Sequence, residues 1–213
     1  DALAQEHGIP LIIDNAYGMP FPNIIYSDVT LNWHENIILC FSLSKIGLPG
    51  VRTGIIVAAP EVVKAVSSLN AIVNLSPTRF GAAIAAPLLN DGRLKQLADQ
   101  VIQPFYRQQA QTAVSLLKRE LGAYPLKIHK PEGAIFLWLW FENLPVSSQT
   151  LYEMLKAEGT LIIPGEHFFV GIDRQDYPHA HECIRMSIAQ DAETLEKGIA
   201  AIGRVVRGLY DKK

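Results

Sequence analysis

The chain alternates short apolar runs with longer stretches in which apolar residues recur every three or four positions. The short runs predict buried strands at residues 9–13, 37–41 and 54–58, and their continuous apolar character is typical of a parallel sheet. The longer stretches predict helices at 60–70, 78–89 and 92–121. Pro104 lies inside the last stretch and predicts a kink or a break there.

The pattern changes after Gly122. An aromatic-rich run predicts a strand at 134–141, and further strands are expected at 160–163 and 184–189. Ser147 or Ser148 is expected to begin a helix that Gly159 ends, and Asp191 to begin the final helix. One face of that final helix is apolar, with Leu195, Ile199, Ile202, Val206 and Leu209.

These elements predict an α/β protein in two parts. Residues 1–105 have the pattern of most of a doubly wound sheet, and residues 106–213 that of a smaller α+β domain. The first residues are expected to be the last turns of a helix that Gly8 ends, which indicates a piece of a longer protein. The alternative is that Asp1 begins a short native helix.

Composition narrows the class of protein. Of 213 residues, 49% are hydrophobic, which is enough for a sizeable core. The charge of −2 leaves no basic excess for nucleic acid, and the apolar runs are too short to cross a bilayer. No signal peptide is expected from the N-terminal sequence. Two widely separated cysteines, Cys40 and Cys183, make no disulfide framework and indicate a cytoplasmic protein.

Asp14 ends the first predicted strand, a position where ligands bind in open α/β sheets. A residue of this kind also serves as a simple turn cap, or as the magnesium-binding aspartate of a P-loop nucleotidase. The phosphate-binding sequence of such a nucleotidase, G-x-x-x-x-G-K-[ST], does not occur in this sequence. Asp14 alone leaves these alternatives open.

The loop after the second predicted strand combines two serines, three glycines, Lys45 and Arg52. Small residues let an anionic ligand approach the backbone, and an arginine fork suits a phosphate. A free lysine has a pKa of about 10.4, so a nucleophilic Lys45 needs either a strong depression of its pKa or prior attachment to an aldehyde. A solvated lysine and a structural arginine are the plain alternative, which fits the convergence of these residues poorly.

The loop reads Ser42-Leu43-Ser44-Lys45-Ile46-Gly47-Leu48-Pro49-Gly50-Val51-Arg52-Thr53-Gly54. It resembles the cofactor-lysine signature of the fold-type I, class I/II aminotransferases, enzymes that use pyridoxal 5′-phosphate (PLP). Asp14-x-Ala16-Tyr17 upstream and Arg185 in a late strand resemble the other two signatures of that family. The sequence of these motifs most resembles that of the valine–pyruvate branch of the family. Members of that branch have the same short spacing that separates Lys45 from Arg52 here.

The resemblance implies a role for each matching residue. Lys45 would hold PLP covalently and move the substrate proton, Asp14 would bind the pyridine nitrogen, and Tyr17 would donate to the ring oxygen. Ser42, Ser44 and Arg52 would hold the phosphate. The remaining match, Arg185, would bind the substrate carboxylate. The plain alternative for Tyr17 is a turn aromatic that packs on the core, and for Arg185 an outward-pointing side chain that pairs with an acid.

The implied fold is PLP-dependent transferase fold type I, with part of the large domain at 1–105 and the small C-terminal domain at 106–213. The implied reaction transfers an amino group between L-valine or L-alanine and a 2-oxo acid, pyruvate or 3-methyl-2-oxobutanoate, as in amino-acid biosynthesis. A PLP-dependent carbon–sulfur lyase or synthase and a non-catalytic regulator domain are the alternatives. The resemblance also implies a homodimer when the protein is full length, and we expect the piece alone to be inactive.

Two further patterns carry no site in this interpretation. His179, His181 and Cys183 would share a face in an extended strand, but no fourth metal ligand is evident, so no metal is expected. The stripe of Trp138 and Trp140 is interpreted as core packing.

Overall fold

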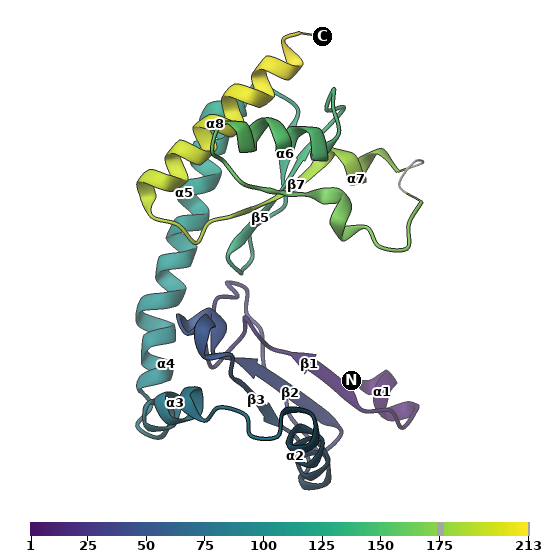
Figure 1. Cartoon of the computed structure of the whole chain (residues 1–213), viewed down its shortest axis with the longest axis vertical. Coiled ribbons are helices and arrows are strands. Elements are labelled where there is room, and N and C mark those ends of the chain that lie inside the picture. Colours follow the sequence, from purple (N-terminus) through teal and green to yellow (C-terminus); the bar gives the residue numbers. More distant parts are fainter. Residues whose placement is uncertain (174–176, 213) are drawn as a thin grey trace. The chain divides into compact units, whose positions relative to one another are not determined.

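The computed structural model describes residues 1–173 and 177–212. The chain divides into two compact units, Asp1–Phe105 and Tyr106–Lys213. Each unit has its own sheet and its own helices (Figure 1).

The first unit contains a three-stranded sheet in the order β1-β2-β3. Its strands are β1 (Leu11–Asp14), β2 (Ile37–Ser42) and β3 (Gly54–Val57). β1 and β2 are parallel, as the sequence predicts, whereas β3 runs antiparallel to β2. The eleven residues between β2 and β3 are too few for the crossover that a parallel strand needs, because such a crossover takes a dozen or more.

The helices of the first unit begin close to the predicted positions. They are α1 (Ala2–Glu6), α2 (Pro60–Asn74), α3 (Phe80–Asn90), α4 (Arg93–Leu97) and the 3₁₀ turns η1 (Ser44–Ile46) and η2 (Pro49–Val51). Alternate residues of β2 pack against α3 and α4 in one core. Its buried members are Phe21, Ile37, Leu39, Phe41, Leu43, Ala85, Leu94 and Ala98.

The predicted interruption of the long helix is a π-helical turn, η3 (Ala98–Ile102), that separates α4 from α5 (Gln103–Leu121). Pro104 is the second residue of α5. The helical conformation runs on from α4 through η3 into α5, and Pro104 lacks the amide that would donate within such a helix, so it interrupts the regular hydrogen-bond ladder here.

The second unit contains an antiparallel sheet in the order β4-β5-β7-β6. The strands are β4 (Leu126–Ile128), β5 (Phe136–Phe141), β6 (Ile163–Pro164) and β7 (Cys183–Ser187). β4 is not predicted by the sequence pattern. β6 is shorter than predicted, because only Ile163 and Pro164 pair with β7.

The remaining helices of the second unit are α6 (Ser148–Ala157), the 3₁₀ turn η4 (Gly165–Phe168), α7 (Pro178–Glu182) and α8 (Ala192–Tyr210). Both predicted N-caps are confirmed, since the side chains of Ser147 and Asp191 accept the amide hydrogens of Thr150 and Thr194. The core joins the inner residues of the strands to α5, α6 and α8. It includes Leu137, Leu139, Phe141, Ile184, Ala113, Leu117, Leu151, Leu155, Ile199 and Val206.

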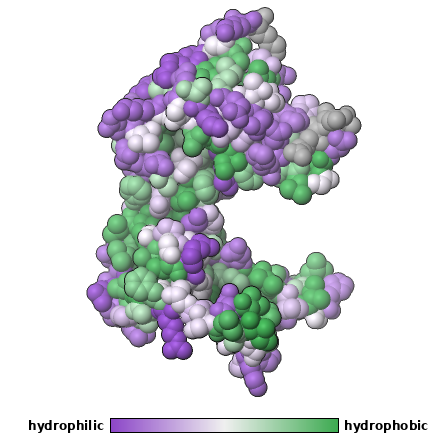
Figure 2. Space-filling model, in the orientation of Figure 1, coloured by the Kyte–Doolittle hydropathy of each residue, from purple (hydrophilic) through white to green (hydrophobic). Residues whose placement is uncertain are grey.

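α2 has an apolar side that no described residue buries. Leu69 is 60% exposed, Ile72 76% and Val73 69%. Apolar surface gathers over this helix in Figure 2. No helix in the described part of the chain combines the length and the apolar character needed to cross a membrane.

Candidate active site

The candidate site begins where the parallel strands of the first unit end. Asp14, the last residue of β1, lies opposite Cys40 of β2, and the amide of Asn15 donates to the Cys40 carbonyl at 2.8 Å. Asp14 and Ser42 are therefore both at the carboxyl edge of the sheet, where ligands bind in open α/β sheets. The side chain of Asp14 is exposed at this edge.

Lys45 lies in the 3₁₀ turn that follows β2. Its amine is 5.6 Å from the centre of the Tyr17 ring, within the range of a cation–π contact. Asn15 holds the segment that carries Tyr17, because its buried amide donates to the Met19 carbonyl at 2.6 Å. The structure thus brings together the lysine and the tyrosine that the two sequence motifs indicate.

The loop after β2 returns to β3 as a compact turn. The amide of Leu43 donates to the Thr53 carbonyl at 3.2 Å, and Ser42 lies opposite Gly54. The amide of Ser44 donates to the Ser42 hydroxyl oxygen at 3.2 Å. Ser42, Ser44 and the exposed Arg52 consequently belong to one turn at the same edge as Asp14.

Two features make this turn tight. Arg52 has φ 47°, ψ 48°, a left-handed conformation that is uncommon outside glycine. Gly81 of α3 lies against Thr53, and a Cβ on Gly81 would be 2.0 Å from the Thr53 hydroxyl oxygen. The position of Arg52 is therefore supported by a helix that packs on the neighbouring residue.

The charges of this edge are not paired by the residues that the structure describes. Among residues 1–173 and 177–212, the Asp14 carboxylate, the Lys45 amine and the Arg52 guanidinium have no hydrogen bond or ion pair. A carboxylate, an amine, hydroxyls and a guanidinium together match an aromatic aldehyde that carries a cationic ring nitrogen and a phosphate. These side chains therefore match the charged and polar groups of PLP.

Arg185 belongs to the second unit, in β7, opposite Trp138 of β5. It is half-buried, and its guanidinium carbon lies 4.1 Å from the ring centre of Phe136 and 4.8 Å from that of Phe168. Arg185 and Phe136 line a cavity of about 260 Å³ together with the 129–133 segment. Within the described residues, the guanidinium makes no ion pair or hydrogen bond.

The two aromatic neighbours of Arg185 are functional candidates that the sequence reasoning missed. Phe136 was predicted to lie in the 134–141 strand and was given no functional role. Phe168 lies between two predicted strands and was given none either. The interpretation of Trp138 and Trp140 as core is wrong, because the buried residues of β5 are the alternate ones. The alternation of the strand was the signal that could have separated the two faces.

The extended geometry that a shared metal site would need is not found at the histidine pair. Residues 178–182 form the short helix α7, so His179 and Cys183 are four residues apart on a helical turn, with Sγ 3.5 Å from Nε2. Burial raises the pKa of Cys183 to about 12, so it is no ready thiolate. No three histidine, cysteine, aspartate or glutamate side chains gather as a metal site in the described residues.

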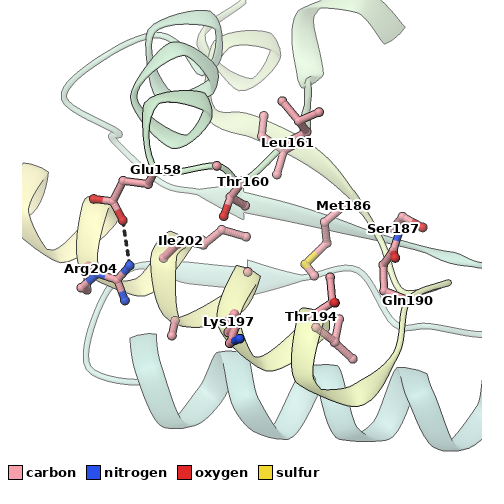
Figure 3. A pocket seen from close by; sticks show the side chains of 16 residues that line it. Glu158, Thr160, Leu161, Met186, Ser187, Gln190, Thr194, Lys197, Ile202 and Arg204 are labelled. Carbon is pink, nitrogen blue, oxygen red and sulfur yellow. Dashed lines mark hydrogen bonds and ion pairs between the residues drawn. The ribbon is translucent and has the colours of Figure 1, made fainter.

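A separate cavity of about 690 Å³ lies among α8, the 158–162 segment and β7 in the second unit (Figure 3). None of the residues inferred from the motifs lines it. Its two cations are engaged, since Lys197 pairs with Glu193 and Arg204 pairs with Glu158 at 2.8 Å. The charges at this cavity are therefore neutralised from within the chain.

Comparison with known proteins assigns the chain to a family. Residues 1–202 match the family model described as aminotransferase class I and II. The chain is 46% identical to valine–pyruvate aminotransferase of Escherichia coli over 206 residues, which are 97% of this chain and 49% of that protein.

Solved structures agree with this match. A putative amino-acid aminotransferase from Psychrobacter arcticum is 69% identical, with a TM-score of 0.95 over 100% of this chain and 48% of that one. Valine–pyruvate aminotransferase from Salmonella typhimurium is 44% identical, with a TM-score of 0.91 over 100% of this chain and 55% of that one. The chain spans about half the length of these relatives, and it belongs to the class I and II aminotransferases, with the fold of PLP-dependent transferases of fold type I.

Proposed function

We propose that this chain supplies the cofactor lysine, the phosphate loop and the substrate arginine of a PLP-dependent aminotransferase. The observation that carries the proposal is the Lys45 amine over the Tyr17 ring, at the sheet edge that also carries Asp14, where neither charge is paired by a described residue. Charged groups without partners at the edge of a buried sheet are typical of a site that a ligand completes.

PLP, when bound, supplies an electron sink for the charge that develops on the α-carbon of the amino acid. Lys45 would hold the cofactor through Nζ and would carry the proton of the substrate α-carbon. Asp14 would accept a hydrogen bond from the pyridine nitrogen and favour its protonated form. Tyr17 would donate its hydroxyl hydrogen to the ring oxygen.

The remaining residues bind charged groups. Arg52 donates to the phosphate, and the hydroxyls of Ser42 and Ser44 complete that contact. Arg185 binds the substrate carboxylate, which its planar fork of donors matches. Arg52 and Arg185 are suited to these anions because no acidic side chain among the described residues pairs with either guanidinium group.

The proposed reaction transfers an amino group between L-valine or L-alanine and pyruvate or 3-methyl-2-oxobutanoate. The relatives named valine–pyruvate aminotransferases, at 46% and 44% identity, support these substrates. A carbon–sulfur lyase or synthase and a regulator domain are not favoured.

We also propose that residues 1–105 are part of the large domain and that residues 106–213 are the small domain. The full-length protein is proposed to be a homodimer and a cytoplasmic enzyme of amino-acid biosynthesis.

The test uses the chain with added PLP. Borohydride reduction followed by peptide mass mapping is expected to place the cofactor on Lys45, and a label that maps to another lysine would refute the assignment. Pyridoxamine phosphate formed with L-valine indicates transamination, whereas pyruvate and ammonia from a β-substituted amino acid indicate a lyase. Because the chain spans half of its relatives, we expect little or no steady-state turnover from these 213 residues alone.

A further inference from the structure

The guanidinium of Arg185 is held by aromatic rings from two different elements. Phe136 comes from β5, the strand beside β7, and Phe168 comes from the end of the 3₁₀ turn η4. Both ring centres lie within the 6 Å range of a cation–π contact, at 4.1 and 4.8 Å. Rings attract a guanidinium through their faces and leave its N–H donors free.

Phe168 is itself fixed in place. Its ring meets Trp138 edge to face, with 5.3 Å between ring centres. The turn that carries Phe168 packs closely on β7, because a Cβ on Gly165 would lie 2.5 Å from the carbonyl oxygen of Cys183. The ring is thus supported from the sheet and from its own backbone, although Phe168 is 43% exposed.

The carboxylate that lines the cavity beside Arg185 is already engaged. Glu132 accepts a hydrogen bond from Lys130 at 2.6 Å, and this contact lowers the pKa of Glu132. Arg185 is half-buried, and Glu132 lines the same cavity. Because Glu132 is paired with Lys130, the N–H donors of Arg185 stay available for a ligand. An arginine whose donors are free binds a ligand more tightly if its flexible side chain is already oriented before the ligand arrives.

We infer that Phe168, together with Phe136, is a positioning residue that orients Arg185 for a substrate carboxylate. The inference rests on the proposed function, because it assigns the carboxylate to Arg185. Phe168 is the residue to vary, since Phe136 is part of the central strand ladder. Removing the ring of Phe168 while keeping an apolar side chain leaves the guanidinium free to rotate.

The experiment measures binding of 3-methyl-2-oxobutanoate to the 213-residue chain, with 3-methylbutan-2-one as the ligand that lacks the carboxylate. Binding is followed through the Nε–H signal of Arg185 in a ¹⁵N-labelled sample. Phe168→Leu is expected to shift this signal in the free chain, because a ring current is lost, and to weaken binding roughly two- to fivefold. Phe168→Tyr keeps the ring and is expected to bind as the parent does.

Phe169→Leu is the matched control, because Phe169 contacts the rings of Trp138, Tyr177 and His179 but has no contact with the guanidinium among the described residues. Unchanged binding by Phe168→Leu, or equal weakening by Phe169→Leu, would overturn the positioning role alone, provided that Arg185→Gln abolishes binding. Unchanged binding by Arg185→Gln, or no carboxylate-dependent binding by the parent chain, would overturn the carboxylate site and the positioning role together.

Discussion

The amine of Lys45 lies 5.6 Å from the centre of the Tyr17 ring, although the two residues are 28 positions apart in sequence. The contact joins the turn after β1 to the turn after β2. It places the amine beside an aromatic face without giving it an acidic partner among the described residues.

Lys45→Arg separates the charge of this residue from its chemistry. The guanidinium keeps a cation over Tyr17, so the free energy of unfolding is expected to change by less than about 0.5 kcal/mol. A guanidinium has no free amine at neutral pH, so borohydride is expected to fix no cofactor on the chain. Lys64→Arg on the exposed side of α2 is the control and should retain the label; loss of the label in both variants would point to general damage.

Gly81→Ala tests the support behind Arg52. The new methyl group would lie 2.0 Å from the Thr53 hydroxyl oxygen and 2.7 Å from its Cβ, so the loop or α3 must shift. We expect a loss of about 1–3 kcal/mol in urea unfolding and weaker binding of PLP. Gly50→Ala in the same loop meets no atom within 4 Å and should stay within about 0.5 kcal/mol of the parent.

Asp99 predicts a pH dependence of stability. Its pKa is lowered by hydrogen bonds from Lys95 of α4 and from Asn23. The bond from Asn23, at 2.8 Å, joins η3 to the segment after Tyr17. A lowered pKa in the folded state means that the stabilisation is complete above the unfolded value of about 3.9 and is lost as the pH falls below it.

Asp99→Asn is therefore expected to be less stable than the parent at neutral pH, with a difference that shrinks as the pH falls below about 4. Urea unfolding at a series of pH values measures this difference. Asp28→Asn is the control, because Asp28 is exposed and has no hydrogen bond or ion pair with the described residues. A difference between Asp99→Asn and the parent that grows on acidification would contradict the sign.

The exposed side of α2 predicts self-association. Ile72→Lys with Val73→Lys should reduce association of the chain in light scattering, because large apolar patches drive contacts between molecules. Unfolding is expected to change by less than about 0.5 kcal/mol, since neither side chain is buried. Ile199→Lys in the core of the second unit should instead unfold the chain, and an equal effect of the two changes would refute the exposed placement.

Sequence reasoning succeeded where a local rule determines the structure. The helix starts at Ser147 and Asp191 and the left-handed stops at Gly8 and Gly159 follow from capping and from the freedom of glycine at positive φ. The sequence also singled out the Lys45 loop, because its candidate chemistry is concentrated in one short segment, and the role of that loop stays a prediction.

Sequence reasoning failed where pairing partners lie far apart. β4 is only three residues long and exists because it pairs with β5, while β6 is confined to two residues by its pairing with β7. The antiparallel direction of β3 depends on the length of the loop before it, which a strand pattern does not report. The 178–182 segment forms a short helix that the sequence pattern did not predict.

By itself, the amino-acid sequence determined the α/β class and the aminotransferase family, and it singled out Lys45 and Asp14 as candidate site residues, because strand periodicity, capping and clustered chemistry are properties of neighbouring residues. Only the tertiary structure decided that Tyr17 lies under the lysine and that Phe136 and Phe168 hold Arg185. Such contacts join residues from separate elements, and packing brings those elements together for reasons that no local pattern contains.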